Sequence, residues 1–293
     1  MSTITQVSLR RRLTSSTAVV LMGIAVAAAL VPLISLLWTV ISRGVRRFDL
    51  AFVTQSMRGI VGAGGGASHA IAGSLLITGA ATLMCVPLGV LAAVYMTEYG
   101  RGLPVRVITF LVDVMTGIPS IVVGLFAYAV ASLFFGPGIR SGLVASGALV
   151  LLMLPVVIRS SEEMLRMVPL DLREASYALG APRWRTIASV VLPTALPGIT
   201  SGALLGVARI VGETAPLLLV AGFTDSMNGN LLDGRMATLP VFIYSQWQNQ
   251  GADASAYSNR AWTAALVLVL FVLALNIAAK AAIRLTQRHK GQS

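Results

Sequence analysis

The sequence predicts an all-α, polytopic membrane protein with six transmembrane helices, and two observations support this. First, 56% of the 293 residues are hydrophobic and only 11% are charged, whereas soluble globular proteins carry about 25% charged residues. Second, the apolar residues gather in six runs, and a helix needs roughly 20 apolar residues to cross the hydrocarbon core of a bilayer. These runs cover residues 17–41, 70–96, 107–135, 141–159, 194–222 and 261–283.

The same composition excludes several other classes of protein. The formal net charge of +11 would suit a nucleic-acid-binding domain, but the hydrophobic content does not fit a soluble one, so no nucleic-acid partner is predicted. The apolar excess also excludes intrinsic disorder, and the single cysteine excludes a disulfide framework. His69, His289 and Cys85 are too few and too scattered for a catalytic site, and no G-x-S-x-G motif occurs. We therefore predict a chain that is not an enzyme and binds neither a metal nor a cofactor.

The first run, at Thr17–Ile41, follows three arginines at 10–12. It is too long for a signal peptide and lacks a convincing cleavage site, so we predict a retained signal-anchor helix. The segment 42–67 then carries four arginines. We predict that it lies at the membrane interface, with its apolar side chains on the membrane and its arginines at the head groups. These apolar side chains are Phe48, Leu50 and Phe52.

The distribution of basic residues predicts the orientation. Six spans place both termini on one side, and cytoplasmic segments carry an excess of Lys and Arg. With the N-terminus in the cytoplasm, 14 of the 22 basic residues fall in inside segments and seven in outside segments. Both termini are therefore predicted to be cytoplasmic. The predicted organisation begins with a cytoplasmic tail over 1–16, followed by the first transmembrane helix and an outer interfacial loop over 17–69. A core of five transmembrane helices covers 70–283 and includes a cytoplasmic loop over 160–193. A second cytoplasmic tail covers 284–293.

The third run is longer than one span requires, so it is expected to tilt or break. Gly117 and Pro119 mark the place where a break would occur. Asp113 is predicted in the first turn of this span, near the cytoplasmic interface, because a helix N-terminus favours an acidic residue.

The cytoplasmic loop 160–193 is much longer than a connection needs and is helical in pattern. Asp171 and Glu174 have the spacing of a capping box, and Gly180 suits a helix C-terminus that needs a positive φ. Pro182 suits the first turn of a second helix. Two short helices joined at a glycine would form a protruding elbow. On these residues alone two interpretations are open: an amphipathic elbow on anionic lipid, or a docking element for a soluble partner.

Two charged residues, Arg209 and Glu213, lie within the fifth apolar run. Their i, i+4 spacing predicts one helix face, and charges at this depth normally face a bundle interior or a wet cavity. They form either a structural ion pair or an anion-handling site in which Glu213 restrains the guanidinium. Arg159, at the end of the fourth span, is either a second such group or an ordinary interfacial anchor.

A glycine repeat precedes these charges. Gly198, Gly202 and Gly206 recur every four residues and therefore share one helix face. Small residues at this spacing let two membrane helices approach closely. We predict that this ridge packs against another helix and that the fifth run lines a pore.

The loop also carries a recognisable motif. Residues 174–193 resemble the EAA---G---------I-LP loop of ABC-importer permeases, with Ser for the second Ala and Val for Ile. The resemblance implies the type I importer permease architecture, in which this loop forms coupling helices that sit in a cleft of the ATP-hydrolysing subunit. The matching residues are Glu174, Ala175, Ser176, Gly180, Val190, Leu192 and Pro193.

A closer resemblance covers the chain from about residue 70 to its C-terminus. The segments 116–125, 155–169, 172–187 and 208–218 are similar to phosphate-specific transport permeases of the A type. This similarity implies that Arg159 and Arg209 take part in phosphate passage, with Glu213 as a partner of Arg209 or a gate. It also implies a second permease subunit of the C type, two copies of an ATP-binding subunit, an external phosphate-binding protein, and a location in the bacterial plasma (inner) membrane.

Other functions stay open on the sequence. Lys280 and Lys290 are the only lysines, and neither lies in a G-x-x-x-x-G-K-[ST] motif, so ATP hydrolysis is expected on a partner. A permease of the same architecture for another oxyanion, such as molybdate or sulfate, is the nearest alternative. A channel or secondary transporter that needs no ATPase is a more distant one.

Overall fold

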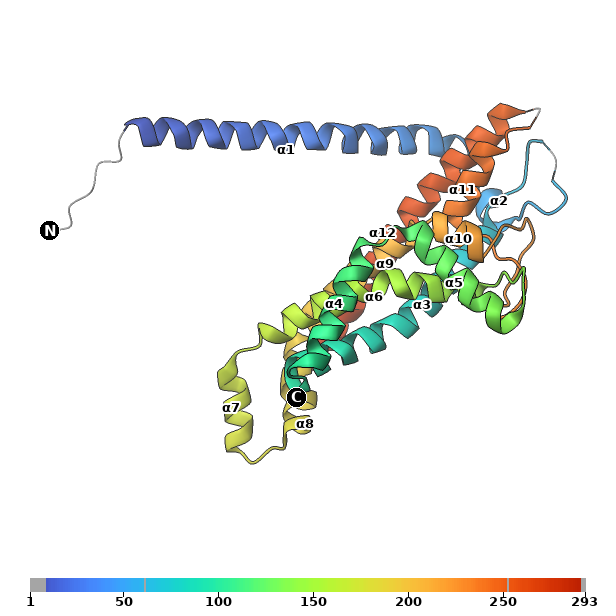
Figure 1. Cartoon of the computed structure of the whole chain (residues 1–293). Coiled ribbons are helices and arrows are strands. Elements are labelled where there is room, and N and C mark those ends of the chain that lie inside the picture. Colours follow the sequence, from blue (N-terminus) through green and yellow to red (C-terminus); the bar gives the residue numbers. More distant parts are fainter. Residues whose placement is uncertain (1–8, 61, 252, 291–293) are drawn as a thin grey trace.

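The computed structural model of the chain describes residues 9–60, 62–251 and 253–290. Over these ranges every regular element is a helix, which confirms the all-α prediction. Within the described ranges, five helices are long and apolar enough to cross a membrane, and a bent helix pair makes a sixth candidate. Figure 1 shows an elongated bundle with a helical elbow, α7 and α8, at one end and the loops around α2, α5 and α11 toward the other.

The first helix, α1 (Leu9–Gly44), begins inside the predicted tail and packs on the rest of the chain only near its C-terminal end. The most apolar 18-residue stretch of α1 has no buried residue, and Figure 1 shows the helix projecting away from the bundle. Gly44 meets the side chain of Leu266, and Thr263 Oγ1 donates a hydrogen bond to the Gly44 carbonyl at 2.9 Å. Arg43 lies over the ring of Trp262 at 5.2 Å. The helix is thus held to its own chain at one end.

The interfacial segment differs from the prediction at Phe52. The short helix η1 (Val45–Arg47) is followed by the helix α2 (Leu50–Thr54). Asp49 is the N-cap of α2, and its carboxylate accepts a hydrogen bond from Phe52 N at 2.7 Å. Phe52 is fully buried in a cluster with residues of α3, α11 and α12, so the prediction that it lies on the membrane is wrong. Large aromatic side chains contribute strongly to the packing of a core, and Phe52 does so here.

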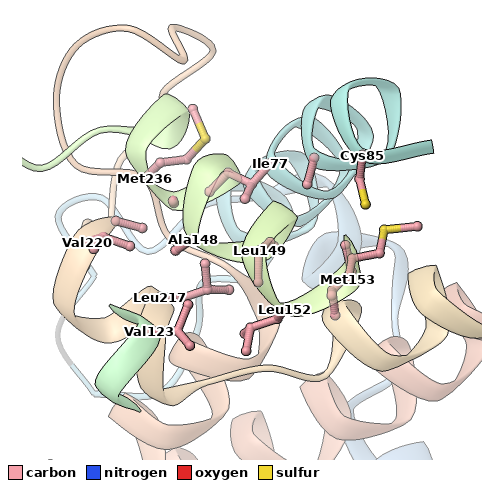
Figure 2. Packing of buried hydrophobic residues seen from close by; sticks show 14 of the residues in the cluster. Ile77, Cys85, Val123, Ala148, Leu149, Leu152, Met153, Leu217, Val220 and Met236 are labelled. Atoms are coloured by element: carbon pink, nitrogen blue, oxygen red, sulfur yellow. The ribbon is translucent and has the colours of Figure 1, made fainter. Parts of the chain in front are cut away.

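The core forms around α6 (Gly142–Arg166), which packs between α3 (Ser68–Val94) and α9 (Leu192–Val211). Ala, Ser and Gly residues on α6 let its neighbours come close, and larger side chains fill the space between the helices, as Figure 2 shows. The labelled members of this cluster are Ile77, Cys85, Val123, Ala148, Leu149, Leu152, Met153, Leu217, Val220 and Met236.

The third apolar run is broken, as predicted at Gly117 and Pro119. It forms α4 (Leu103–Gly117) and α5 (Ser120–Phe135), which are bent by 113°. Pro119 stands just before α5, where its missing N–H leaves no helical hydrogen bond unmade. Because α4 starts earlier than expected, Asp113 lies in its second half, and its predicted place in a first turn is wrong.

The fifth run is also not one helix. α9 ends at Val211, and a separate short helix, α10 (Ala215–Val220), begins after Gly212, Glu213 and Thr214. Pro216 explains the interruption, because in a continued helix its ring would clash with the carbonyl of residue 212. The prediction that Arg209 and Glu213 share one helix face at i, i+4 is therefore wrong.

The last two helices are α11 (Leu239–Gln248) and α12 (Ala254–Lys290), and α12 extends beyond the predicted run at both ends. Arg260 lies inside α12 and is fully buried. Its Nε donates to Gln246 Oε1 and its Nη1 to the carbonyl of Gly62, each at 2.6 Å. This arginine ties α11, α12 and the glycine-rich loop before α3 together.

Candidate functional site

Arg209 lies in the last turn of α9 and is exposed in the isolated chain. A cation is favoured at a helix C-terminus by the helix dipole. Among the residues that the structure describes, its side chain has neither a hydrogen-bond nor an ion-pair partner. Since an arginine inside a bilayer costs at least roughly 2.5–3.5 kcal/mol, its guanidinium must meet water, a ligand or another chain. Glu213 is half-buried in the break between α9 and α10 and makes no ion pair with it.

The glycine ridge on α9 faces α6. A Cβ on Gly198 would overlap Met164, and one on Gly202 would overlap the hydroxymethyl group of Ser160. One on Gly206 would lie 3.0 Å from Met153 Cγ. The two helices can approach this closely only because these three positions lack side chains.

This contact relates the two candidate arginines to each other. Arg159 immediately precedes Ser160, which contacts Gly202, and Arg209 lies two helical turns beyond Gly202. At 1.5 Å per residue, the two arginines are offset by about 10 Å along the helix axes. They therefore occupy successive levels on two adjoining helices.

Arg159, unlike Arg209, is held by carboxylates of its own chain. Its Nη2 pairs with the carboxylate of Asp113 on α4, and its Nη1 donates to Glu162 Oε2 at 3.1 Å. Glu162 also accepts from Arg166 Nη2 at 2.7 Å. The spacing of Arg159, Glu162 and Arg166 at i, i+3 and i, i+4 is a sequence signal that could have indicated the pairs within α6. The contribution of Asp113 has no such signal, because it comes from a different helix.

The predicted elbow consists of α7 (Leu170–Ala178), α8 (Arg183–Thr186) and the π-helical turn η3 (Ile187–Val191). Gly180 joins α7 to α8 with a φ of +78°, as its position predicted. The capping box is wrong: α7 already starts at Leu170, so Asp171 lies inside the first turn and caps nothing. Pro182 precedes α8 instead of lying in its first turn.

The motif residues divide between the tip and the base of the elbow. At the tip, Glu174 and Ala175 are exposed, and Ser176 Oγ lies 2.9 Å from Thr186 Oγ1, which links α7 to α8. The outer surface carries large exposed apolar side chains, among them Leu179 and Trp184. At the base, Val190 lies in η3, and Leu192 and Pro193 begin α9. The elbow thus presents an unburied apolar surface and leads directly into the helix that carries Arg209.

A buried ion pair fixes the elbow to the bundle. Arg173 on α7 pairs through Nη1 with Glu98, which lies in the π-helical turn η2 (Tyr95–Tyr99) at the end of α3. Its Nη2 donates to the carbonyl of Leu165 on α6 at 2.9 Å. A third contact places Arg183 over the ring of Tyr99 at 5.2 Å. Arg173 therefore joins the elbow to the ends of both α3 and α6, and sequence reasoning missed this pair because Glu98 is distant along the chain.

Replacing Arg173 by glutamine is expected to loosen the elbow. Removing one partner of a buried ion pair costs about 3–5 kcal/mol, because the remaining carboxylate stays desolvated. We expect the Tm of the protein in detergent to fall by several degrees. Arg101→Gln removes an exposed arginine at the same end of the bundle and is the matched control. Equal Tm values for the two variants would contradict a structural role of this pair.

Three grooves in the described part of the chain have linings that do not suit an anion. Two adjoining cavities of about 340 and 440 Å³ lie between α3, α9 and α12 and are lined by aliphatic and aromatic side chains and threonines. A third, of about 330 Å³, lies at the α4–α5 bend and is lined by apolar side chains such as Met115, Ile118 and Phe126. Apolar surfaces of this kind suit lipid tails or other helices.

Comparison with known proteins adds to this picture. Residues 85–291 match the family model described as binding-protein-dependent transport system inner membrane component. The phosphate transport system permease protein PstA 1 of Mycobacterium tuberculosis is 47% identical over 279 residues, which cover 93% of this chain and 89% of that protein. The phosphate transport system permease protein PstA of Yersinia pestis is 41% identical over 249 residues, which cover 85% and 82%.

Solved structures share the fold. A chain of the MetNI methionine ABC transporter in an inward-facing conformation matches with a TM-score of 0.60 at 22% identity, over 74% of this chain and 94% of that one. A chain of a bacterial alginate ABC transporter, solved with a periplasmic protein bound to an alginate pentasaccharide, matches with a TM-score of 0.62 at 14% identity, over 92% and 95%.

Proposed function

This chain belongs to the family of binding-protein-dependent transport system inner membrane components, and from that premise we propose that it is the permease subunit of an ATP-driven importer of inorganic phosphate. The observation that carries the proposal is Arg209, which lies on a membrane-spanning helix and has no side-chain partner among the described residues, in a chain that is 47% identical to a phosphate transport system permease protein. As a transport subunit, it leaves ATP hydrolysis to a partner.

The chemistry of passage follows from the two arginines. A phosphate ion loses strong hydration when it enters the membrane, and a guanidinium replaces part of it with charge-assisted, bidentate hydrogen bonds. Arg209, which pairs with no other residue in the described part of the chain, can do this directly, whereas Arg159 first has to give up a carboxylate. The offset of about 10 Å between them suits two successive binding positions along one path. We propose that Glu213, which lies in the break after α9, responds when that helix moves.

The proposed assembly contains other chains. The exposure of Arg209 and of α1 supports a second permease subunit that completes the pathway. The exposed apolar surface of the elbow supports docking to ATP-binding subunits, of which we propose two copies. An external phosphate-binding protein would deliver the substrate. We propose a location in the bacterial inner membrane with the elbow and both termini cytoplasmic, and in Figure 1 the C-terminal end of α12 and the elbow lie at the same end of the bundle.

Competition for uptake tests the substrate. In cells or proteoliposomes that contain the complete transporter, uptake of labelled phosphate is measured with an excess of unlabelled phosphate, sulfate or molybdate. We expect phosphate to compete strongly, and a tenfold excess of either other anion to reduce uptake by less than half. Transport of sulfate or molybdate that phosphate does not inhibit would overturn the assignment.

Replacing Gly180 by valine is expected to separate the ATP-binding subunits from the permease. The φ of +78° at Gly180 lies in the left-handed region, which a β-branched residue adopts only with strain. The angle between α7 and α8 would change, and we expect co-purification of the ATP-binding subunit to fall at least fivefold. Gly59→Val is the matched control, because Gly59 has a φ of +73°, equally open surroundings and a position far from the elbow. Loss of the ATP-binding subunit from both variants would show a general folding defect instead.

A further inference from the structure

The ion-pair cluster around Arg159 is electrically balanced without any substrate. It contains two arginines, Arg159 and Arg166, and two carboxylates, Asp113 and Glu162. An oxyanion that bound to Arg159 with both carboxylates in place would give the cluster a net negative charge. Like charges at contact distance in a partly buried site repel strongly. Binding of an anion therefore requires that one carboxylate withdraws.

The two carboxylates differ in how easily they can withdraw. Glu162 has only 9% of its side chain exposed and is bonded to both Arg159 and Arg166. Asp113 has 60% of its side chain exposed, and within the described part of the chain its carboxylate pairs with Arg159 alone. Withdrawal of Glu162 from Arg159 would cost a nearly buried carboxylate one of its two partners, whereas Asp113 can exchange its partner for water at little cost. Asp113 also lies in the second half of α4, where the helix dipole disfavours an acid.

The helix that carries Asp113 has an independent attachment. Val112 and Ile158, the residues next to Asp113 and Arg159, are buried in a shared apolar cluster together with Met96. This cluster keeps α4 docked on α6 whether or not the ion pair is closed. Opening the pair therefore requires only rotation of the Asp113 side chain, and no movement of the helix.

We propose that Asp113 is the exchangeable counter-ion of Arg159. The Asp113 carboxylate pairs with the Arg159 guanidinium between transport events, and the transported oxyanion replaces that carboxylate during passage. Return of the carboxylate then displaces the oxyanion toward the cytoplasm. One anion replaces another at a fixed cation, so the position that Asp113 vacates on the Arg159 guanidinium is filled again, while Glu162 stays bonded to it. The inference rests on the proposed function, because it takes the transported oxyanion to be phosphate.

The test is equilibrium binding of labelled inorganic phosphate to the complete transporter in lipid nanodiscs, without the external binding protein. Asp113→Asn keeps the shape of the side chain and removes the competing charge, so we expect at least fivefold tighter binding and slower release. Arg159→Gln should weaken binding at least tenfold. The double variant should bind as weakly as Arg159→Gln alone, because Asp113 acts only through Arg159. Asp113→Glu should keep the affinity within twofold of the wild type.

Glu163→Gln is the matched control, since it removes an exposed carboxylate close to the cluster on α6. It should bind phosphate as the wild type does. An unchanged affinity of Asp113→Asn, or a gain that persists in the double variant, would overturn the exchange role. A wild-type complex that binds and transports sulfate but not phosphate would instead count against the proposed function. The binding of labelled sulfate to the same variants would then test the exchange role of Asp113.

Discussion

Replacement of Arg209 by glutamine is expected to lower phosphate uptake at least a hundredfold and to leave the assembled transporter at its wild-type level. The two parts of this expectation have separate reasons. Hydrogen bonds to a charged group contribute about 1.5–3 kcal/mol each, and 1.4 kcal/mol corresponds to a factor of ten. A bidentate contact to a phosphate ion therefore accounts for a hundredfold effect. The fold is spared because Arg209 is exposed and has no polar partner within residues 9–60, 62–251 and 253–290.

Two further variants make this result specific. Arg209→Lys keeps the positive charge and loses the planar fork of donors, so uptake should fall by about tenfold, between the wild type and the glutamine variant. Arg58→Gln removes an exposed arginine from the segment before α3 and should leave uptake unchanged. The measurement is the initial rate of labelled phosphate uptake, normalised to assembled complex. Wild-type uptake by Arg209→Gln would remove Arg209 from the pathway.

Replacement of Gly202 by leucine is expected to prevent stable assembly of the bundle. A side chain at this position would overlap Ser160 on α6, and both backbones are held in place by buried neighbours such as Ile199 and Val157. Overpacking a core by a few atoms costs about 1–3 kcal/mol, and a whole isobutyl group between two touching helices exceeds that range. We expect less than a tenth of the wild-type yield of folded protein in detergent, and a Tm lower by at least 10 °C for the remainder.

The control for this experiment lies on the partner helix. Gly147 is a glycine in α6 with no atom near the position of a Cβ, so Gly147→Leu adds the same group without overlap. It should give nearly the wild-type yield and Tm. If both variants gave the same loss, the effect would come from the added bulk in any membrane helix and not from the contact between α6 and α9.

The sequence is informative where one local rule determines the outcome. The break at Gly117 and Pro119 and the left-handed φ of Gly180 depend on the backbone freedom of one or two residues, and both predictions agree with the structure. A similar local rule applies at Pro216, whose ring would clash with the Gly212 carbonyl in a continued helix, so α9 ends at Val211. With that rule applied, Arg209 and Glu213 would not have been placed on one helix face.

The candidate site depends on contacts that no local rule contains. Asp113 and Glu98 reach Arg159 and Arg173 from elements 46 and 75 residues away along the chain. A single sequence gives the hydrophobicity and length of each span, but it does not give the rotation of one helix against another. The expectation for Asp113 was wrong because α4 begins at Leu103, ahead of the apolar run that was used to place the span, so Asp113 falls in the second half of the helix.

The exposed helix α1 has a consequence for how stability is measured. Because it touches its own chain only near Gly44, its free energy depends on the surrounding lipid and hardly on the packing of the bundle. Heating the protein in detergent would thus report two processes with separate midpoints, the melting of the bundle and the loss of helix in α1. A single fitted transition would average them. The bundle and α1 therefore unfold as two separate units, and a two-state free energy of unfolding describes neither the whole chain nor α1.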